Sequence, residues 1–190
     1  MKKLLSVALL VFSVNALANN CNSGYQPFGM LGALINQVIC DVTKPDYTNN
    51  TQITLPDGWE NFKLTAEQIS QGYVINSTKT GTWVAVSAVK KGNNRPDLLI
   101  ENARKKQAET LEISEQTTPV EITVDGRRAW SWETQGKTKA QNLKWVFFTT
   151  VIEGNSNIIV LESRVGQANT NLYDRAQDLR RLPSEITIVE

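Results

Sequence analysis

The chain has 190 residues and a formal net charge of +1 at pH 7, from 20 basic and 19 acidic side chains. Such a balance gives no broad positive field that would attract nucleic acid or an anionic membrane. The chain also contains no histidine, the side chain that titrates near neutrality and most often binds metals. Its absence excludes Ser-His-Asp and Cys-His nucleophile systems, nearly all catalytic zinc sites, and haem bound by a proximal histidine. We therefore expect no metal, no cofactor and no nucleic-acid partner.

The first element is a predicted secretion signal at Met1–Ala18. Lys2 and Lys3 form a positive start, Leu4–Val14 an apolar run, and Ala16–Ala18 a small-x-small cleavage site. The apolar run has eleven residues, whereas a membrane-spanning helix needs about 20, so a retained anchor is the weaker alternative. Cleavage after Ala18 would remove both lysines and leave 172 residues with a net charge of −1, a length suited to one domain. The sequence thus predicts a soluble periplasmic protein without a membrane span.

Cys21 and Cys40 are the only cysteines of the chain. A lipid-modified signal is cut directly before a cysteine, but Asn19 and Asn20 precede Cys21 here, which disfavours a lipoprotein. In an oxidising compartment, two cysteines 19 positions apart predict one disulfide. Closing such a loop is worth roughly 3 kcal/mol in the chain-entropy model. The predicted bond staples an N-terminal segment, residues 19–50, made of a helix and a connector.

Hydrophobic periodicity predicts helices and strands along the rest of the chain. The first half contains a helix at Phe28–Cys40, a polar connector at Asp41–Thr51, a short strand at Ile53–Leu55, and a β-hairpin of residues 72–78 and 81–89. The second half contains a helix at Pro96–Leu111, a hairpin of Val120–Val124 and Arg128–Trp132 around Asp125-Gly126, strands at Leu143–Ile152 and Ile158–Val165, a helix at Asn171–Leu182 that ends at Pro183, and an extended piece at Ile186–Ile188. Leu172, Tyr173, Ala176 and Leu179 are expected to face the core.

This order predicts an α+β fold, with one domain over residues 51–190 and an antiparallel β-sheet with flanking helices. The strand at Leu143–Ile152 is almost continuously apolar, so we expect both of its faces to be covered and Trp145 to lie in the core.

Catalysis without histidine would require another motif. Ser87 and Lys90 match the S-x-x-K spacing of serine-lysine enzymes, which requires a helix. Their neighbours predict a strand, in which positions three apart point to opposite faces, so the match carries no dyad. Neither a calcium-binding loop nor a glycine-rich phosphate loop is present. Paired carboxylates stay open as an alternative, but the sequence favours no particular pair, and we expect no catalytic residues.

Motifs within residues 50–183 resemble the PsbP-like family, which includes DcrB-type bacterial envelope proteins. They are the turn Pro56-Asp57-Gly58-Trp59, the strand through Trp83–Ser87, the helix after Pro96, the hairpin at Val124–Ala129, the long strand through Phe147-Phe148, and the closing helix. The resemblance implies a scaffold that acts by binding other proteins rather than by catalysis. It does not extend to the N-terminal segment or its disulfide, and fold analogy names no partner.

Six residues are candidates for a partner-binding surface. Trp130 and Trp132 alternate on one face of a strand, where they form either an aromatic platform or part of the packing beneath a helix, which is the commoner arrangement. The other candidates are Trp59 beside its turn, Arg127 and Arg128 at the hairpin end, and Tyr25 in the N-terminal segment. A structural role is the alternative for each of them.

The sequence therefore predicts a non-enzymatic, exported domain that binds a partner protein in the bacterial envelope. A specific form is an immunity protein that neutralises a toxin delivered to the periplasm. The alternative is a small-molecule-binding protein, or a carboxylate-dependent enzyme, of the envelope. Neither the partner nor the oligomeric state follows from the sequence.

Overall fold

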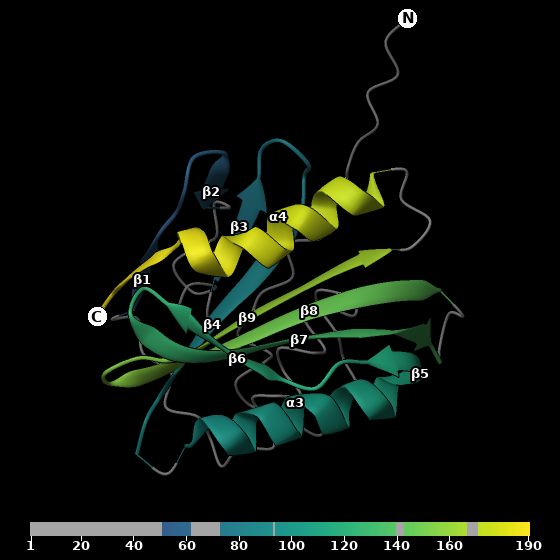
Figure 1. The fold of residues 1–190 in the computed structure, drawn as a ribbon, viewed down its shortest axis with the longest axis horizontal. Helices are drawn as coiled ribbons and strands as arrows, with labels where there is room; N and C mark the ends of the chain where they lie inside the picture. The colour runs from purple at the N-terminus through teal and green to yellow at the C-terminus, as the bar shows by residue number, and fades with distance from the viewer. Residues whose placement is uncertain (1–50, 62–72, 93, 140–142, 167–170) are drawn as a thin grey trace, which may run out of the picture.

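The computed structural model describes residues 51–61, 73–92, 94–139, 143–166 and 171–190, which form one α+β unit with a helix on each face of an antiparallel sheet (Figure 1). The strands are β1 (Gln52–Thr54), β2 (Trp59–Asn61), β3 (Tyr73–Ser77), β4 (Trp83–Lys90), β5 (Leu111–Gln116), β6 (Val120–Val124), β7 (Arg127–Thr138), β8 (Lys144–Glu153), β9 (Asn157–Gly166) and β10 (Thr187–Val189). The helices are α3 (Pro96–Thr110) and α4 (Leu172–Glu185). The predicted fold class, an antiparallel sheet with flanking helices in a single domain, is confirmed for these residues. The predicted signal, the helix at 28–40 and the Cys21–Cys40 disulfide lie outside them.

The main sheet has the strand order β2-β3-β4-β9-β8-β7-β5, and β6 also pairs with β7. β8 pairs with Ala129–Lys137, almost the whole length of β7. β6 pairs with Arg127–Ser131 and β5 with Thr134–Thr138. Because β8 occupies one side of β7, β5 and β6 must share the other side, one after the other. Together they form one edge of the sheet.

The turn between β6 and β7 is the predicted Asp125-Gly126 hairpin. Asp125 has a φ of 48° and Gly126 a φ of 72°, and positive φ at both central residues is the requirement of a type I′ turn. Glycine meets this requirement without steric cost, and aspartate tolerates it better than most residues. The hairpin is therefore confirmed, although β7 runs on to Thr138 rather than ending at Trp132.

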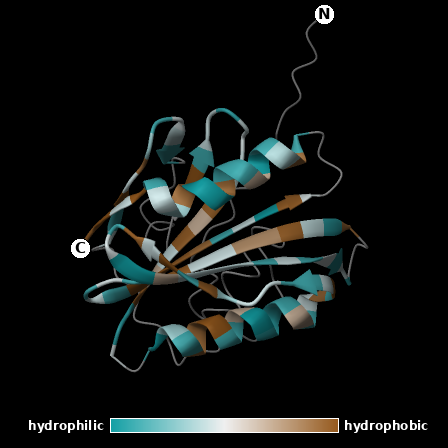
Figure 2. Ribbon diagram, viewed as in Figure 1, coloured by the Kyte–Doolittle hydropathy of each residue, from teal (hydrophilic) through white to brown (hydrophobic). Residues whose placement is uncertain are grey.

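The larger core lies between the sheet and α4. Ala176, Leu179 and Leu182 of α4 pack on apolar side chains of the central strands and of the small β1–β10 sheet. Figure 2 shows hydrophobic residues concentrated on the central strands, whereas both helices carry a mixture of hydrophobic and hydrophilic residues. The prediction that the strand ending at Ile152 is covered on both faces is confirmed for Val146–Ile152.

A smaller core lies on the opposite face, under α3. Leu99 and Ala103 of the helix pack against Trp132 of β7, Val151 of β8 and neighbouring apolar residues of β9. Burying such side chains contributes roughly 1.5 to 3 kcal/mol each, so this contact fixes α3 on the sheet.

Several boundaries differ from the prediction. The helix predicted to end at Leu111 stops one residue earlier, and Leu111 opens strand β5, in which Leu111 and Ile113 are the inward positions of an alternating pattern. β2 was also missed. α4 continues through Pro183 to Glu185, so the proline does not end this helix.

Tyr173 was expected in the core but is 72% exposed, because the buried stripe of α4 passes through Ala176, Leu179 and Leu182 instead. No helix of the described residues is long and apolar enough to cross a membrane.

Candidate functional site

Gln107 of α3 is the centre of a hydrogen-bond network buried between α3 and the sheet. Its amide nitrogen donates to Thr149 Oγ1 (3.1 Å), and its oxygen accepts from the Trp132 indole N–H (3.2 Å) and the Thr134 hydroxyl (2.8 Å). Gln116 of β5 also donates to this oxygen and to Thr134. Every polar atom of the Gln107 amide head therefore has a partner, and the network anchors the second half of α3.

Glu162 of β9 lies beside this network on the same face of the sheet. It stands directly across from Thr149 of β8 and Ala85 of β4, and it is only 7% exposed. None of the hydrogen bonds or ion pairs found among the described residues involves its carboxyl group. Burial therefore raises the pKa of Glu162 to about 7, because the charged form loses its hydration without gaining a partner.

Arg164 follows two positions along β9 and therefore faces the same way as Glu162. Its guanidinium lies over the Trp145 ring of β8, with Cζ 4.8 Å from the ring centroid. One guanidinium nitrogen of Arg164 and the indole N–H of Trp145 are buried and have no hydrogen-bond partner. Burial lowers the pKa of Arg164 from its ordinary value. Trp145, predicted in the core, is half-buried beneath this cation. We call Glu162, Arg164 and Trp145 the unpaired polar cluster.

A second arrangement lies on the exposed part of the β6–β7 hairpin. Arg128 donates two hydrogen bonds to the carboxylate of Glu121, at 2.8 and 2.7 Å, and its guanidinium stacks on Trp130 with Cζ 4.7 Å from the ring centroid. This pairing lowers the pKa of Glu121 and raises that of Arg128. Thr123 stands across from Arg128 and is exposed. We call Glu121, Thr123, Arg128 and Trp130 the β6–β7 surface.

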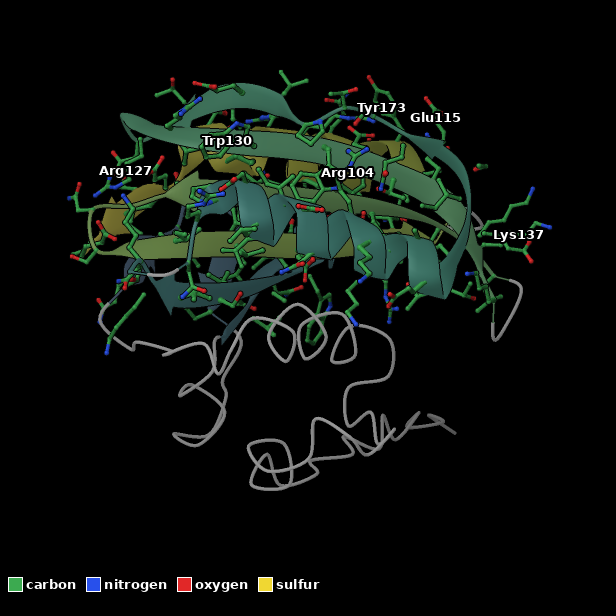
Figure 3. All side chains as sticks on the ribbon, turned by 90° about the horizontal axis from the view of Figure 1, so that it is seen from below. Arg104, Glu115, Arg127, Trp130, Lys137 and Tyr173 are labelled. Carbon is green, nitrogen blue, oxygen red and sulfur yellow. The ribbon has the colours of Figure 1, made fainter. Side chains whose placement is uncertain are left out.

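The β6–β7 surface adjoins a free sheet edge. β6 pairs with β7, and no other described strand pairs with it. Seen from below, Trp130 lies on the sheet beside α3, whereas Arg127 lies at the end of the sheet (Figure 3). The neighbouring residues Arg127 and Arg128 therefore lie in different regions of the molecule, and only Arg128 belongs to the β6–β7 surface.

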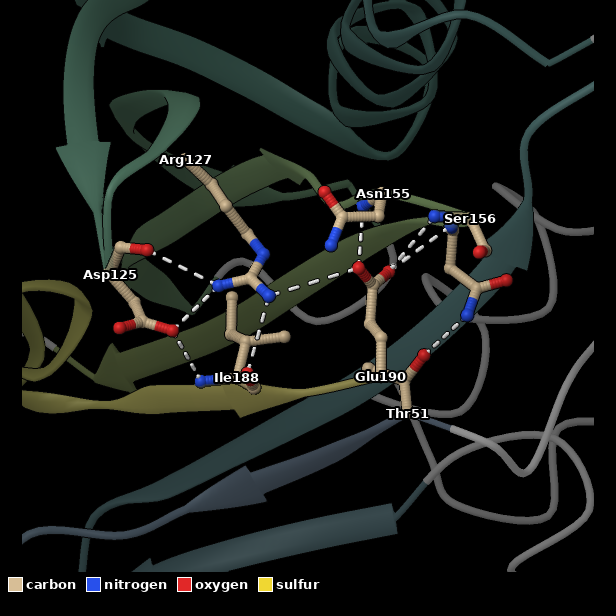
Figure 4. A network of polar contacts seen from close by, with 8 residues as sticks. Thr51, Asp125, Arg127, Asn155, Ser156, Ile188 and Glu190 are labelled. Atoms are coloured by element: carbon tan, nitrogen blue, oxygen red, sulfur yellow. Dashed lines mark hydrogen bonds and ion pairs between the residues drawn. The ribbon is translucent and has the colours of Figure 1, made fainter.

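Arg127 belongs to a network that ties down the C-terminal strand (Figure 4). It donates to the Asp125 carboxylate (2.6 Å) and to the backbone oxygen of Ile188 (3.3 Å), and lies 3.8 Å from the Glu190 carboxylate. Glu190 in turn accepts backbone N–H groups of the β8–β9 turn, from Asn155 and Asn157. This arrangement gives Arg127 a structural role in joining β10 to the sheet.

The remaining candidates from the sequence are placed as follows. Trp132 is 2% exposed and packs beneath α3, so its burial favours the structural alternative over a partner contact. Trp59 is half-buried in β2 and packs against the larger core. Tyr25, Cys21 and Cys40 lie outside the described residues. Among those residues, no group of three or more acidic side chains could hold a metal ion.

Little in the amino-acid sequence indicates the unpaired polar cluster. Its only signal is that Glu162 and Arg164 occupy alternate positions of a strand whose other residues are mostly apolar, and so share the face of Val160. Trp145 could be assigned to that face only once the pairing of β8 with β9 was known.

These features define a single α+β domain built on one antiparallel sheet. No protein-family model matches the sequence, and no curated protein matches it. LpqN of Mycobacterium tuberculosis, described as involved in cell envelope biogenesis, is a structural neighbour with 16% identity and a TM-score of 0.48, over 79% of this chain and 88% of LpqN.

Two further neighbours are more distant. A protein of Bacteroides thetaiotaomicron has 7% identity and a TM-score of 0.44, over 74% of this chain but only 46% of its own length. PA94 of Pseudomonas aeruginosa, a protein of unknown function, has 10% identity and a TM-score of 0.38, over 67% of this chain and 78% of its own. With TM-scores below 0.5, these likenesses assign neither a family nor a function. The PsbP-like resemblance stays a prediction.

Proposed function

We propose that this protein is an exported interaction domain whose partner is a protein of the bacterial envelope, docked on the β6–β7 surface. The observation that supports this most is Arg128, which Glu121 holds with two hydrogen bonds while its guanidinium stacks on Trp130. Tryptophan and arginine are the residue types most enriched among interface hot spots. A side chain already fixed in one orientation also loses less conformational entropy when a partner binds.

The neighbouring edge of β6 supports the same proposal. An edge strand offers main-chain groups to which an extended segment of another protein can add. Pro119 precedes β6 and Glu121 lies within it, and proline and charge at an edge discourage indiscriminate pairing. The β6–β7 surface therefore combines a fixed arginine, Arg128, with a strand edge whose proline and charge limit non-specific pairing.

An immunity protein that neutralises a periplasm-delivered toxin is the specific form of this proposal. The predicted signal at Met1–Ala18 and the lack of a catalytic motif in the sequence support it. A toxin gene adjacent to the gene for this protein would strengthen it, and co-expression should then protect cells from that toxin. Unprotected cells would exclude this form while leaving the wider proposal intact.

Site-specific photo-crosslinking tests the wider proposal. A photoreactive residue at Thr123, on the β6–β7 surface, should yield a discrete protein adduct in living cells. The same residue at Lys79, exposed on the turn between β3 and β4, is the matched control and should not yield that adduct. An adduct that forms equally at Lys79, or the absence of any adduct at Thr123, contradicts the proposed surface.

A further inference from the structure

The unpaired polar cluster is unusual because buried polar groups are normally satisfied. An unsatisfied buried donor or acceptor costs about 1 to 3 kcal/mol, and a charged one costs more. One nitrogen of Arg164 and the indole N–H of Trp145 are buried without a hydrogen-bond partner. Glu162 on the same face is 7% exposed, and no hydrogen bond or ion pair found among the described residues involves its carboxyl group. In the neighbouring Gln107 network on that face, each polar atom of the amide head has a partner. Single buried polar atoms without a partner also occur at Asn76, Arg127 and Arg175, but only Arg164 and Trp145 place two such donors in contact with each other among the described residues.

We propose that Arg164, Trp145 and Glu162 form a binding site for a small zwitterion that carries a carboxylate and a primary ammonium group, of the free amino acid class. This site does not depend on the β6–β7 surface, which lies on other strands.

The donors of the cluster suit the carboxylate end of such a ligand. A guanidinium nitrogen and an indole N–H donate but do not accept hydrogen bonds. The Arg164 guanidinium stacks on the Trp145 ring, so the unpaired guanidinium nitrogen and the indole N–H lie close together on the sheet. A carboxylate has two acceptor oxygens and forms short, charge-assisted bonds with guanidinium groups. It would satisfy both donors and neutralise the half-buried cation.

Glu162 suits the ammonium end of the ligand. Alternate residues of a strand are separated by about 7 Å, so Glu162 and Arg164 can approach a small molecule from its two ends. Without a ligand, the buried carboxyl group is readily protonated, since its pKa is raised to about 7. An arriving ammonium group would favour the ionised form and create a buried ion pair. The apolar residue across from Arg164 is Phe147, which offers a contact for the ligand's carbon atoms.

A ligand titration of the mature protein tests this proposal. The twenty common L-amino acids are added singly, and the melting temperature and tryptophan fluorescence are recorded. At least one amino acid should raise the melting temperature and change the fluorescence. Its N-acetyl derivative, which lacks the ammonium group, and its amide, which lacks the carboxylate, should each bind at least about tenfold more weakly, equivalent to about 1.4 kcal/mol. No response to any of the twenty at millimolar concentration would overturn the proposal.

Variants then assign the binding to these three residues. Arg164→Lys, Glu162→Gln and Trp145→Phe should each weaken binding at least about tenfold. Arg95→Gln is the matched control, because the Arg95 side chain is exposed and forms an ion pair with Asp97, away from the cluster on β8 and β9, and this variant should bind as the wild type does. If a folded Trp145→Phe and a folded Glu162→Gln variant both retain wild-type affinity, the cluster is not the site. Failure here leaves the crosslinking result at Thr123 unaffected, so the two proposals can fail separately.

Discussion

The indole N–H of Trp132 donates a hydrogen bond of 3.2 Å to the side-chain oxygen of Gln107, and this contact joins β7 to α3. The alternation of Trp130 and Trp132 in the sequence allowed either a shared platform or a place beneath a helix. The structure separates the two residues: Trp132 packs beneath α3, while Trp130 lies nearer the β6–β7 turn under Arg128.

Replacement of Trp132 by alanine should destabilise the protein by about 3 to 5 kcal/mol, as large aromatic truncations in a core do. The lost packing against Leu99 and Ala103 would be aggravated by the loss of one donor to Gln107. Urea denaturation measures the change in the free energy of unfolding. A change below about 1 kcal/mol would mean that Trp132 is not part of the core.

Glu162 should make stability depend on pH near neutrality. The pKa of its carboxyl is raised to about 7 in the folded protein, against about 4.3 in an unfolded chain. The folded state thus retains the proton to higher pH, and this contribution to stability is complete below about pH 4.3 and is lost as pH rises through about 7. The loss amounts to something on the order of 3 kcal/mol.

Glu162→Gln isolates this effect, since glutamine does not titrate. Urea denaturation of the wild type and the variant should give similar stabilities at pH 4, and the variant should become the more stable of the two at pH 8. Parallel stability curves for the two proteins across this range would show that Glu162 does not titrate as its burial requires.

Much of the fold follows from local signals in the sequence. The Asp125-Gly126 turn, the apolar run of β8 and the helix that starts at Pro96 were each predicted from turn chemistry or periodicity and are present. Strand β5 was missed because its two inward residues, Leu111 and Ile113, continue directly from a helix without a turn residue between them.

The candidate sites could be predicted only in part. Residue type alone marks Arg128 and Trp130 as interface candidates, but nothing in the sequence indicates that Arg128 pairs with Glu121 across the hairpin. The unpaired polar cluster depends on the β8–β9 register, a contact between strands that local patterns do not specify. The periodicity of a sequence shows which residues of one strand share a face. The pairing between strands determines which residues of other strands lie beside them.

The Glu190 carboxylate should anchor the C-terminal strand. It accepts backbone N–H groups of Asn155 and Asn157 and lies near Arg127. Glu190→Ala should therefore lower the free energy of unfolding by about 1.5 to 3 kcal/mol, as loss of charged hydrogen bonds does. Glu185→Ala is the control, because the exposed pair of Glu185 with Arg181 is worth at most about 1 kcal/mol. Equal effects of the two substitutions in urea denaturation would argue against the anchor.

The export signal can be tested by mass spectrometry of protein recovered from the periplasm. Asn19 should be the first residue, and the mass should be two hydrogens below that of the reduced chain if Cys21 and Cys40 are bonded. A lipid adduct on Cys21, or an uncleaved Met1, would contradict the prediction of a soluble, disulfide-stapled protein.

The affinity of the Arg128→Ala variant for the partner captured through Thr123 tests the proposed function most directly. Arg181→Ala serves as the control, since Arg181 is also exposed and forms a similar ion pair with Glu185 on α4. Loss of Arg128 should weaken binding at least about tenfold, as expected of a hot-spot residue, while the melting temperature stays close to that of the wild type and Arg181→Ala binds normally. Unchanged affinity of Arg128→Ala, or an equal loss in both variants, would contradict a partner site on the β6–β7 surface.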